Sequence, residues 1–510
     1  MRFLRRNVLL VYGVYTVTIV SGLLLTPIIV SALGAEQYGI WAVIGAILAF
    51  VGLLDFGLTP TVIRHGAEQR GRGRPEETDA LASTALALYV VIFVVTALLA
   101  FGLAWALPRV VDMPDDYVWA AQVALLLVVL GWAFRFPLGL FASLLAAQQR
   151  YDVLNVAGFL STVLYVAIVA AVLLWRGGGV LTLAVVTVLV TLVRLLWPLP
   201  WVRKELPGLR LRRRLVTRER ARELVSFSGR NFMIHVASKV VFSTDVIVVG
   251  IVLGSLAAGL YGVPAKLFAL AFGLGLAVTT LLFPLLSELE GAEERERQRA
   301  YLLSGLRLGL AVVLLVSAPL AILPDRFLEA WLQEPGFEES VPVLVVLMAT
   351  LLVAQPGHML TQFLVARGRH HGIAIVRLIA VGANLALSIV LASVVGIWGV
   401  ALATLVTETV ATVIVAPRLV RRETGVGFGD LARAWLRPTA LAAAAALPTL
   451  VLARALPVDT LLEFTLVGAA WTAVFGGVFW RWGMEPVERA RLLGGLGRGS
   501  GAKAALADDV

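Results

Sequence analysis

The chain has 510 residues, of which 59% are hydrophobic and only 15% are charged, and its net charge is +10. Charged residues make up about a quarter of soluble domains, so this composition excludes an ordinary soluble protein. The lack of cysteine excludes disulfides, thiol nucleophiles and thiolate-bound metals. Apolar runs of about 18 or more residues recur from end to end, which predicts an all-α polytopic membrane protein.

The apolar runs predict about fourteen membrane-spanning helices at roughly 20 residues per crossing. The first run is too long for the apolar core of a signal peptide and lacks a small-residue cleavage site, so we expect no cleavable signal peptide. In chain order the predicted spans are 8–30, 38–63, 80–107, 118–147, 153–174, 180–200, 225–253, 257–287, 302–323, 341–366, 372–395, 397–416, 438–455 and 462–482.

Basic residues predict how these spans are oriented, because cytoplasmic loops are enriched in lysine and arginine. With the N-terminus inside, the outer segments hold only Arg109, Arg176 and Arg326 of the 43 basic residues. This bias predicts a multi-pass protein of the inner (cytoplasmic) membrane with both termini in the cytoplasm. No nucleic-acid-binding motif accompanies the charge, so we expect membrane lipids rather than nucleic acid as its partner.

A basic inner segment divides the chain. Residues 201–224 can form an amphipathic cytoplasmic linker helix whose arginines lie among lipid headgroups, with a solvated tether as the alternative. This segment separates an N-terminal six-helix lobe, 1–200, from a C-terminal six-helix lobe, 225–417. Two additional transmembrane helices within 418–483 and a cytoplasmic tail, 484–510, complete the predicted architecture.

One turn recurs about half a chain later. The turn LGAEQYG starts at Leu33 and its counterpart LGSLAAGLYG starts at Leu253, an offset of 220 residues. An Arg-Asn pair precedes each turn, at an offset of 224: Arg6-Asn7 and Arg230-Asn231. A nearly fixed offset predicts two copies of one helical unit, as in many transporters.

Ionisable side chains inside predicted spans are costly, which makes them candidates for function. Arg135, Lys239 and Lys266 all lie near the middle of a span. A helical wheel places the following residues on one polar face of the seventh span: Arg230, Asn231, His235, Ser238, Lys239 and Asp245. Two interpretations stay open. The cations line a water-filled cavity that binds substrate, or they form interhelical ties in which Lys239 or Lys266 pairs with Asp245 or Glu408.

A second set of candidates comprises gating or ion-pair residues: Asp55, Arg64, Arg6, Asp245 and Glu408. Asp55 lies about nine residues before the inner end of the second span, and Arg64 lies at its exit. Asp55 is either a buried tie to an arginine of a neighbouring span or half of an ion pair that forms in one state only. Glu408 is either an ion-coupling carboxylate or a tie between helices.

Four further arginines lie within about two turns of a predicted span end, where snorkelling to the headgroups explains them: Arg194, Arg307, Arg377 and Arg454. No phosphate-binding loop GxxxxGK[ST] and no HExxH motif is present. No predicted loop is long enough for a soluble catalytic domain. We therefore expect neither an enzyme nor a bound cofactor or metal.

Several of these stretches resemble the polysaccharide flippases of the multidrug/oligosaccharidyl-lipid/polysaccharide exporter superfamily, which export O-antigen and exopolysaccharide units. The similar stretches are the N-terminal Arg-Asn pair, TPIIVSALGAEQYGIWAV, LLDFGLTPTVIRH and the second turn LGSLAAGLYG. Arg6, Asp55, Arg64 and Arg230 lie at positions of these motifs. Arg135, Lys239 and Lys266 are assigned from depth and sign alone.

The resemblance implies two six-helix lobes around a central cavity that opens alternately to each side. The cargo it implies is a polyprenyl-pyrophosphate-linked oligosaccharide, with cavity cations holding the pyrophosphate. The last two of fourteen spans would line a groove for the lipid tail, as in the related lipid II flippases. Glycosyltransferases or a polymerase of the same pathway are the implied protein partners.

Two other functions stay open at this point. A multidrug or organic-cation antiporter of the same superfamily would be expected to have an acidic, aromatic cavity, which the mid-span cations disfavour. A membrane-embedded polysaccharide polymerase or ligase would need a sizeable outer loop, and the longest predicted one runs only from Pro324 to Ser340. The glycan, the coupling ion and the partner enzymes do not follow from the sequence.

Overall fold

The computed structural model describes residues 2–73, 75–455 and 459–490. Within these ranges the side chains of 2–16, 18, 75, 227–243, 370–371, 452 and 454–455 fall outside the description. The described chain contains helices, turns and loops and no strand, which confirms the predicted all-α class.

The helices follow one another with short connections. From the N-terminus they are α1 (Arg2–Val51), η1 (Gly52–Asp55), α2 (Leu58–Arg72), α3 (Pro75–Val110), α4 (Asp115–Ala133), α5 (Arg135–Ala147), α6 (Tyr151–Arg176), α7 (Val180–Leu196), α8 (Leu199–Glu205), η2 (Arg213–Leu215) and α9 (Arg218–Gly291). They continue with α10 (Arg295–Ile322), α11 (Pro324–Leu332), α12 (Ser340–Ala366), α13 (His370–Val395), α14 (Ile397–Thr409), η3 (Val410–Val415), α15 (Ala416–Thr424), α16 (Phe428–Ala455), α17 (Leu461–Val478) and η4 (Phe479–Gly483).

Twelve stretches of the described chain are long and apolar enough to cross a membrane. Two of them, Ile19–Arg72 and Thr244–Gly291, are 54 and 48 residues long. At 1.5 Å per residue each far exceeds the ~30 Å apolar core of a bilayer, so neither can be a single crossing. Each is interrupted by a glycine with positive φ, Gly34 at 70° and Gly254 at 87°. Counting each as two crossings gives fourteen, in agreement with the predicted number.

The two interrupted helices cross each other at a second pair of glycines. A β-carbon on Gly39 would lie 1.8 Å from the Ser255 carbonyl oxygen, and one on Gly259 would lie 2.0 Å from the Ala35 carbonyl oxygen. Both contacts keep the offset of 220, so each repeat makes the same contact with the other. Only residues without a side chain permit this backbone approach, as in small-residue crossings of membrane helices.

The contacts of the chain form two compact units. The first contains Met1–Lys266, Leu332–Val343 and Arg377–Thr404. The second contains Leu267–Trp331, Leu344–Val376 and Leu405–Val510. The division into lobes at 1–200 and 225–417 stays a prediction.

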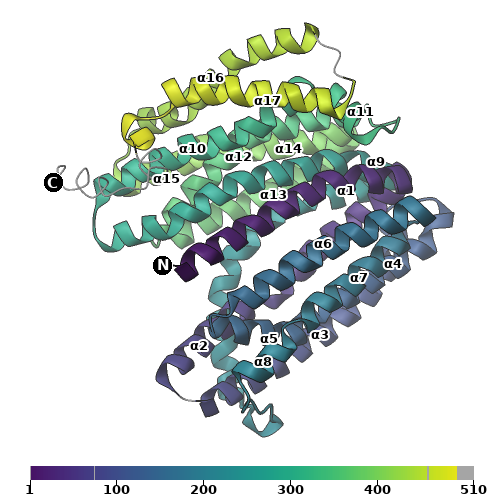
Figure 1. Cartoon of the computed structure of the whole chain (residues 1–510), viewed down its shortest axis with the longest axis vertical. Coiled ribbons are helices and arrows are strands. Elements are labelled where there is room, and N and C mark those ends of the chain that lie inside the picture. Colours follow the sequence, from purple (N-terminus) through teal and green to yellow (C-terminus); the bar gives the residue numbers. More distant parts are fainter. Residues whose placement is uncertain (1, 74, 456–458, 491–510) are drawn as a thin grey trace. The chain divides into compact units, whose positions relative to one another are not determined.

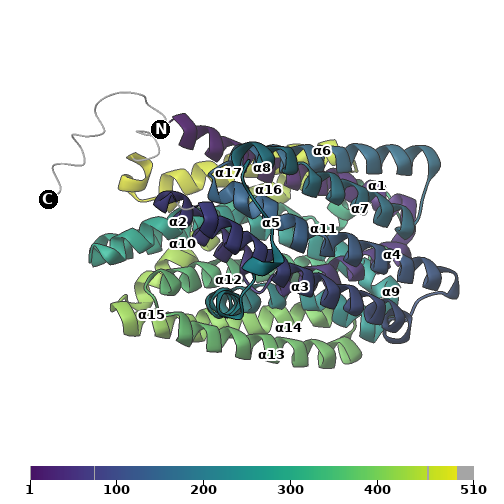
Figure 2. The same cartoon turned by 90° about the horizontal axis from the view of Figure 1, so that it is seen from below.

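In the first unit α3 packs on α4, α4 on α7, and α6 on both α1 and α7 (Figures 1 and 2). The residues of 201–224 form α8, a loop, η2 and the start of α9 rather than one continuous helix, because Pro207 and Gly208 follow the end of α8. The loop is attached to α3, since the Arg210 N–H donates to Asp79 and the Arg212 N–H donates to Ser83, both at 3.0 Å.

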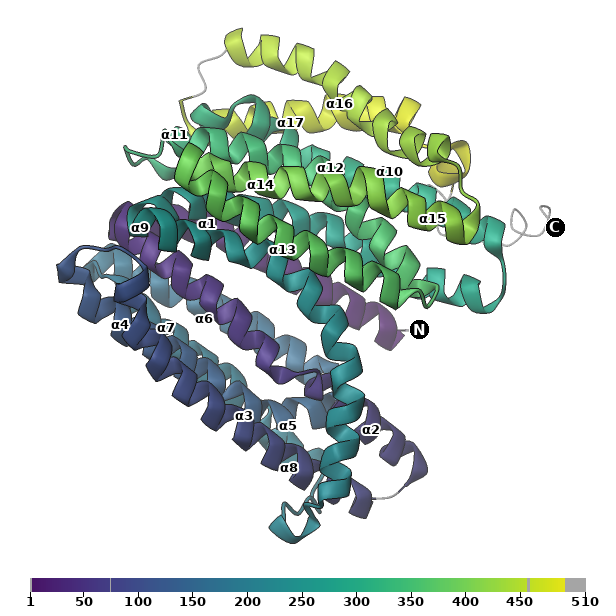
Figure 3. The same ribbon diagram turned by 180° about the vertical axis from the view of Figure 1, so that it is seen from behind.

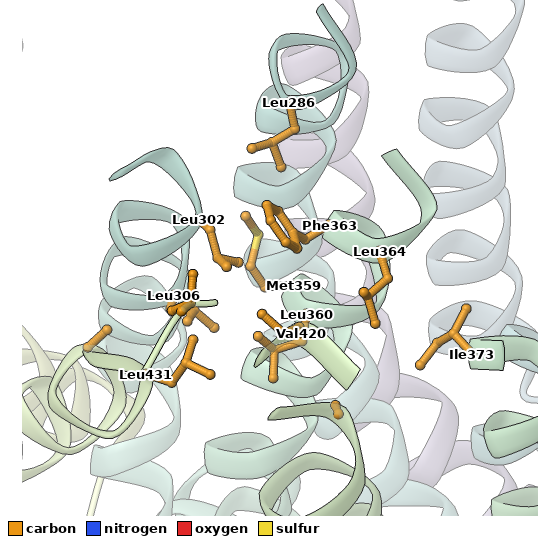
Figure 4. Close-up of a cluster of buried hydrophobic side chains, with 13 residues drawn as sticks. Leu286, Leu302, Leu306, Met359, Leu360, Phe363, Leu364, Ile373, Val420 and Leu431 are labelled. Carbon is orange, nitrogen blue, oxygen red and sulfur yellow. The ribbon is translucent and has the colours of Figure 1, made fainter. Parts of the chain in front are cut away.

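In the second unit α16 and α17 pack on α10 (Figure 3). Two indole N–H groups anchor them, with Trp435 donating to the Leu352 carbonyl at 2.8 Å and Trp471 to the Leu314 carbonyl at 3.3 Å. The additional helices are therefore an integral part of this unit. Buried leucines surround Met359 and Phe363, and this cluster joins α9, α10, α12 and α15 to α16 (Figure 4).

Candidate functional site

Asp245 of α9 is an enclosed charged side chain among the predicted site residues, at only 4% exposure. Its Oδ2 atom accepts hydrogen bonds from the Tyr261 hydroxyl at 3.0 Å and the Thr404 hydroxyl at 2.8 Å. The Thr404 oxygen in turn accepts from the Asn384 amide at 3.0 Å. Three segments of the first unit, on α9, α13 and α14, therefore meet at this carboxylate.

Oδ1 of Asp245 is buried without a hydrogen-bond partner among the described residues, and so is the hydroxyl of Ser388, which lies one turn from Asn384 on α13. Leaving a buried polar group unpaired costs about 1–3 kcal/mol, and more for a charged group. A proton on the carboxylate, or a dehydrated monovalent cation shared with hydroxyl and amide oxygens, would compensate this cost. The arrangement therefore offers the oxygen atoms that a bound proton or small cation would need.

The interpretation of Asp245 as the partner of a lysine is only partly open to inspection, because the side chain of Lys239 lies outside the described structure and its pairing stays a prediction. The described contacts of Asp245 are the hydroxyls of Tyr261 and Thr404. Lys266 is exposed on α9, whereas Glu408 is 2% exposed on α14, one turn beyond Thr404. A role of Glu408 in coupling stays a prediction.

Asp55 lies where the second predicted span is interrupted. Phe56 and Gly57 adopt left-handed backbone conformations, and α2 starts directly after them. The Asp55 carboxylate accepts from the Thr59 N–H at 3.2 Å and from the Thr59 hydroxyl at 2.8 Å. It thereby satisfies a backbone N–H in the first turn of α2, as a capping side chain does. A gating ion pair for Asp55 stays a prediction.

Arg135 begins α5, directly after the break at Phe134 that ends α4. Its side chain is exposed, and its guanidinium lies 5.2 Å from the ring centre of Trp132. Arg64 is exposed on α2. Neither Arg135 nor Lys266 has a carboxylate partner among the described side chains.

Five predicted site residues have side chains outside the described part of the structure: Arg6, Arg230, Asn231, His235 and Lys239. The backbone of all five is helical, in α1 and α9. Their proximity to Arg135 and Lys266 stays a prediction.

The sequence analysis missed the uncharged members of the Asp245 network. Tyr261 lies in the repeated turn, at the position that Trp41 has in the first copy. This exchange of tryptophan for tyrosine could have indicated that the second copy needs a hydroxyl there. Asn384 and Thr404 lie among other small polar residues in apolar helices, and no local pattern distinguishes them.

Comparison with known proteins agrees with this fold. The profile of a family described as polysaccharide biosynthesis protein matches residues 4–290. An uncharacterized membrane protein of Bacillus subtilis (strain 168), EpsK, is 23% identical over 406 residues, which cover 79% of this chain and 80% of EpsK.

Two solved structures share the fold. A lipid II flippase, MurJ, in an inward closed conformation has a TM-score of 0.71 at 14% identity and aligns with 93% of this chain and 98% of its own. A multidrug resistance transporter of the MATE family and MOP superfamily, inward-facing, has a TM-score of 0.67 at 16% identity, over 82% of this chain and 95% of its own.

Proposed function

Because this chain belongs to the polysaccharide biosynthesis protein family, we propose that it is a flippase that moves a polyprenyl-pyrophosphate-linked oligosaccharide across the cytoplasmic membrane. It is a multi-pass membrane transporter of this family, with the fold of a lipid flippase over almost its whole length. In this proposal the cargo supplies cell-surface polysaccharide synthesis, and glycosyltransferases or a polymerase of the pathway act before and after it.

The proposed cargo is supported mainly by one observation, which is that exposed charged side chains near the middle of the spans are positive. Arg135 and Lys266 are exposed cations in membrane-spanning helices and have no carboxylate partner among the described side chains. A pyrophosphate cannot cross hydrocarbon unaided, because an uncompensated charge is costly there. Arginine and lysine compensate that charge, and arginine does so with two parallel hydrogen bonds. The prenyl tail can stay in the lipid throughout.

Alternating access explains the two repeats. Transporters built from repeats move one half against the other around a site near the midplane. The chain has no phosphate-binding loop for ATP, so an ion gradient, the membrane potential or downstream consumption of the cargo would supply the energy. Cation binding at Asp245 is the proposed link to a gradient, and we place both termini in the cytoplasm because of the distribution of basic residues.

The fold shared with the multidrug transporter supports one alternative, an organic-cation antiporter. A cationic drug would be repelled by Arg135 and Lys266 unless an anion neutralised them. The alternative therefore predicts efflux of a dye such as ethidium in proteoliposomes, whereas the flippase does not.

Transport of a synthetic lipid-linked oligosaccharide in proteoliposomes tests the proposal, with an added glycosidase reporting sugars that reach the outside. We expect transport by the wild type and at least roughly tenfold slower transport by Lys266→Gln, since one charge-assisted hydrogen bond contributes about 1.5–3 kcal/mol. Lys204→Gln is the matched control, because Lys204 is exposed near the end of α8. Ethidium efflux without oligosaccharide transport would overturn the proposal.

A further inference from the structure

A polar cavity lies in the first unit, where α2, α3 and the start of α9 come together. Its volume is about 280 Å³, and each of the three helices contributes polar side chains to its wall, among them Gln69, Thr84 and Glu223. A single water molecule needs only ~10–15 Å³, so the cavity can hold a molecule of several heavy atoms. None of the residues that we assign to the cargo or to ion coupling lines it.

Buried leucines form the apolar side of this cavity. Leu81 of α3 and Leu224 of α9 lie in its wall and are 5% and 4% exposed. Both belong to a buried cluster that also contains Val62 of α2, so the three helices share one packed core beneath the cavity. The leucines offer no hydrogen bond, and a ligand would place its carbon atoms against them.

The arginines of the wall already have partners in the protein. Arg72 forms an ion pair with Glu68 at 2.7 Å, one turn away on α2. Arg220 of α9 donates to the Leu215 carbonyl at 3.4 Å. The charge of Arg72 is thus compensated, and both guanidinium groups have acceptors without a ligand.

Several acceptors of the wall, by contrast, lack a donor. Oε1 of Gln69 is buried without a hydrogen-bond partner in the described structure. The Glu223 carboxylate has no ion-pair partner among the described side chains. The buried Thr84 hydroxyl donates to the Ala80 carbonyl at 2.8 Å, so its oxygen presents lone pairs only. Leaving buried acceptors unpaired is unfavourable, so the cavity favours a ligand that donates hydrogen bonds.

The charge of the wall favours a cation. Three glutamates, two arginines and one histidine line the cavity: Glu68, Glu77, Glu223, Arg72, Arg220 and His65. Carboxylates outnumber guanidinium groups, so a neutral histidine leaves an excess of negative charge, which attracts a cation. No three His, Asp or Glu side chains in the described part of the chain could hold a metal ion. A primary ammonium group has three N–H donors and no acceptor, which matches the unpaired acceptors.

We propose that this cavity binds a primary alkylammonium ligand. The ammonium group donates to Gln69 and Glu223, and the carbon chain packs against Leu81 and Leu224. Under the predicted orientation the cavity lies on the cytoplasmic side, because α2 and α3 are joined there. The ligand is therefore either a free amine of the cytoplasm or the amino headgroup of an inner-leaflet lipid.

Binding of radiolabelled diaminobutane to the full-length protein tests this site, in nanodiscs of phosphatidylcholine, whose headgroup has no N–H donor. We expect saturable binding by the wild type and at least tenfold weaker binding by Glu223→Gln and by Gln69→Leu, since each loses a charge-assisted hydrogen bond. Glu223 is exposed, so Glu223→Gln should fold normally. Glu219→Gln is the matched control and should bind like the wild type, because Glu219 is exposed in the first turn of α9 and does not line the cavity.

Methylation of the ligand separates hydrogen bonding from charge. The fully N-methylated analogue of diaminobutane keeps both charges but has no N–H, so it should bind at least tenfold more weakly. Equal binding of the two compounds would overturn the ammonium site. Unchanged binding of diaminobutane by Glu223→Gln, or no saturable binding by the folded wild type, would do the same.

Phosphatidylethanolamine added to the nanodiscs distinguishes the sources of the ammonium group. If this lipid competes with diaminobutane, the ligand is a lipid headgroup, and if it does not compete, the ligand is a soluble amine; both results support the site. Failure of amine binding would leave the flippase proposal intact, because the two proposals rest on different residues. Loss of oligosaccharide transport by the wild type, by contrast, would overturn the proposed function and leave this cavity unaffected.

Discussion

The two interrupted helices, α1 and α9, have the same turn but different chemistry. Gly34 and Gly254 share a left-handed backbone, at an offset of 220. At the same offset Asp245 of α9 corresponds to Leu25 of α1, and both side chains are buried, at 4% and 5% exposure. The repeat therefore keeps what the backbone requires and does not keep the buried charge.

This asymmetry has a physical cost that indicates function. Burying a leucine stabilises a protein by about 1.5–3 kcal/mol, whereas burying a carboxylate with an unpaired oxygen is unfavourable. The Asp245 network is thus stabilised poorly by comparison with its counterpart in α1. Buried ionisable groups in membrane spans are typical of ion pathways, so under the proposed function coupling would belong to the second repeat and structural support to the first.

The largest expected effect tests the symmetric part of the comparison. Gly39→Leu and Gly259→Leu should each prevent folding, because a β-carbon at either position would overlap a backbone oxygen of the other repeat. Backbone at such distances cannot yield as a flexible side chain can, so the cost should exceed the usual ~1–3 kcal/mol of overpacking. Size-exclusion chromatography of fluorescent fusions in detergent measures the folded fraction.

Gly45→Leu is the matched control on α1, because open space surrounds Gly45. It should express and elute like the wild type. If Gly39→Leu folds normally while Gly259→Leu does not, the contact is not equivalent in the two repeats, and the symmetric half of the comparison is wrong.

The second-largest expected effect tests the difference between the repeats, which is the buried charge of Asp245 in place of Leu25. Asp245→Asn should lower gradient-driven transport by at least roughly tenfold, since one charged hydrogen-bonding site contributes about 1.5–3 kcal/mol. Its melting temperature should stay equal or rise, because a buried charge is removed. Leu25→Ala should do the opposite, losing about 2–5 kcal/mol of stability while the transport rate per folded molecule keeps its gradient dependence.

Proteoliposomes with separate sodium and proton gradients make this measurement and identify the coupling ion. If transport by Asp245→Asn still depends on the ion gradient, the second repeat does not couple transport to that ion. Equal loss of coupling in Leu25→Ala would show that the two positions are not functionally different.

The sequence predicted the fold well because membrane helices depend on local hydrophobicity and on glycine turns. The repeated turn at Leu33 and Leu253 coincides with the interruptions of α1 and α9. The twelve candidate spans, two of which are long enough for two crossings, are consistent with the predicted fourteen. The linker 201–224 was less predictable, because Pro207 and the contacts of its backbone with Asp79 and Ser83 decide its shape.

Parts of the candidate site depend on packing between distant segments. Asp245 was recognisable as a charge in an apolar helix, but Thr404 lies 159 residues away and contacts it only through the fold.

The smallest effect concerns the other carboxylate of the repeats, Asp55, and decides between a cap and a gate. Asparagine caps a helix as well as aspartate does, so Asp55→Asn should change stability by less than about 0.5 kcal/mol if the contact with Thr59 is its role. Thr59→Val, which removes the hydroxyl donor, should cost about 0.5–2 kcal/mol by analogy with other caps, with transport within about twofold of the wild type. If Asp55 instead forms a gating ion pair, Asp55→Asn should lose transport, because asparagine keeps the hydrogen bond with Thr59 but not the charge. Chemical denaturation and oligosaccharide transport of both variants separate the two roles. Lost transport with unchanged stability in Asp55→Asn would give the first repeat an ionic function of its own, at the end of η1. The two repeats would then differ in where they place a functional carboxylate, not in whether they have one.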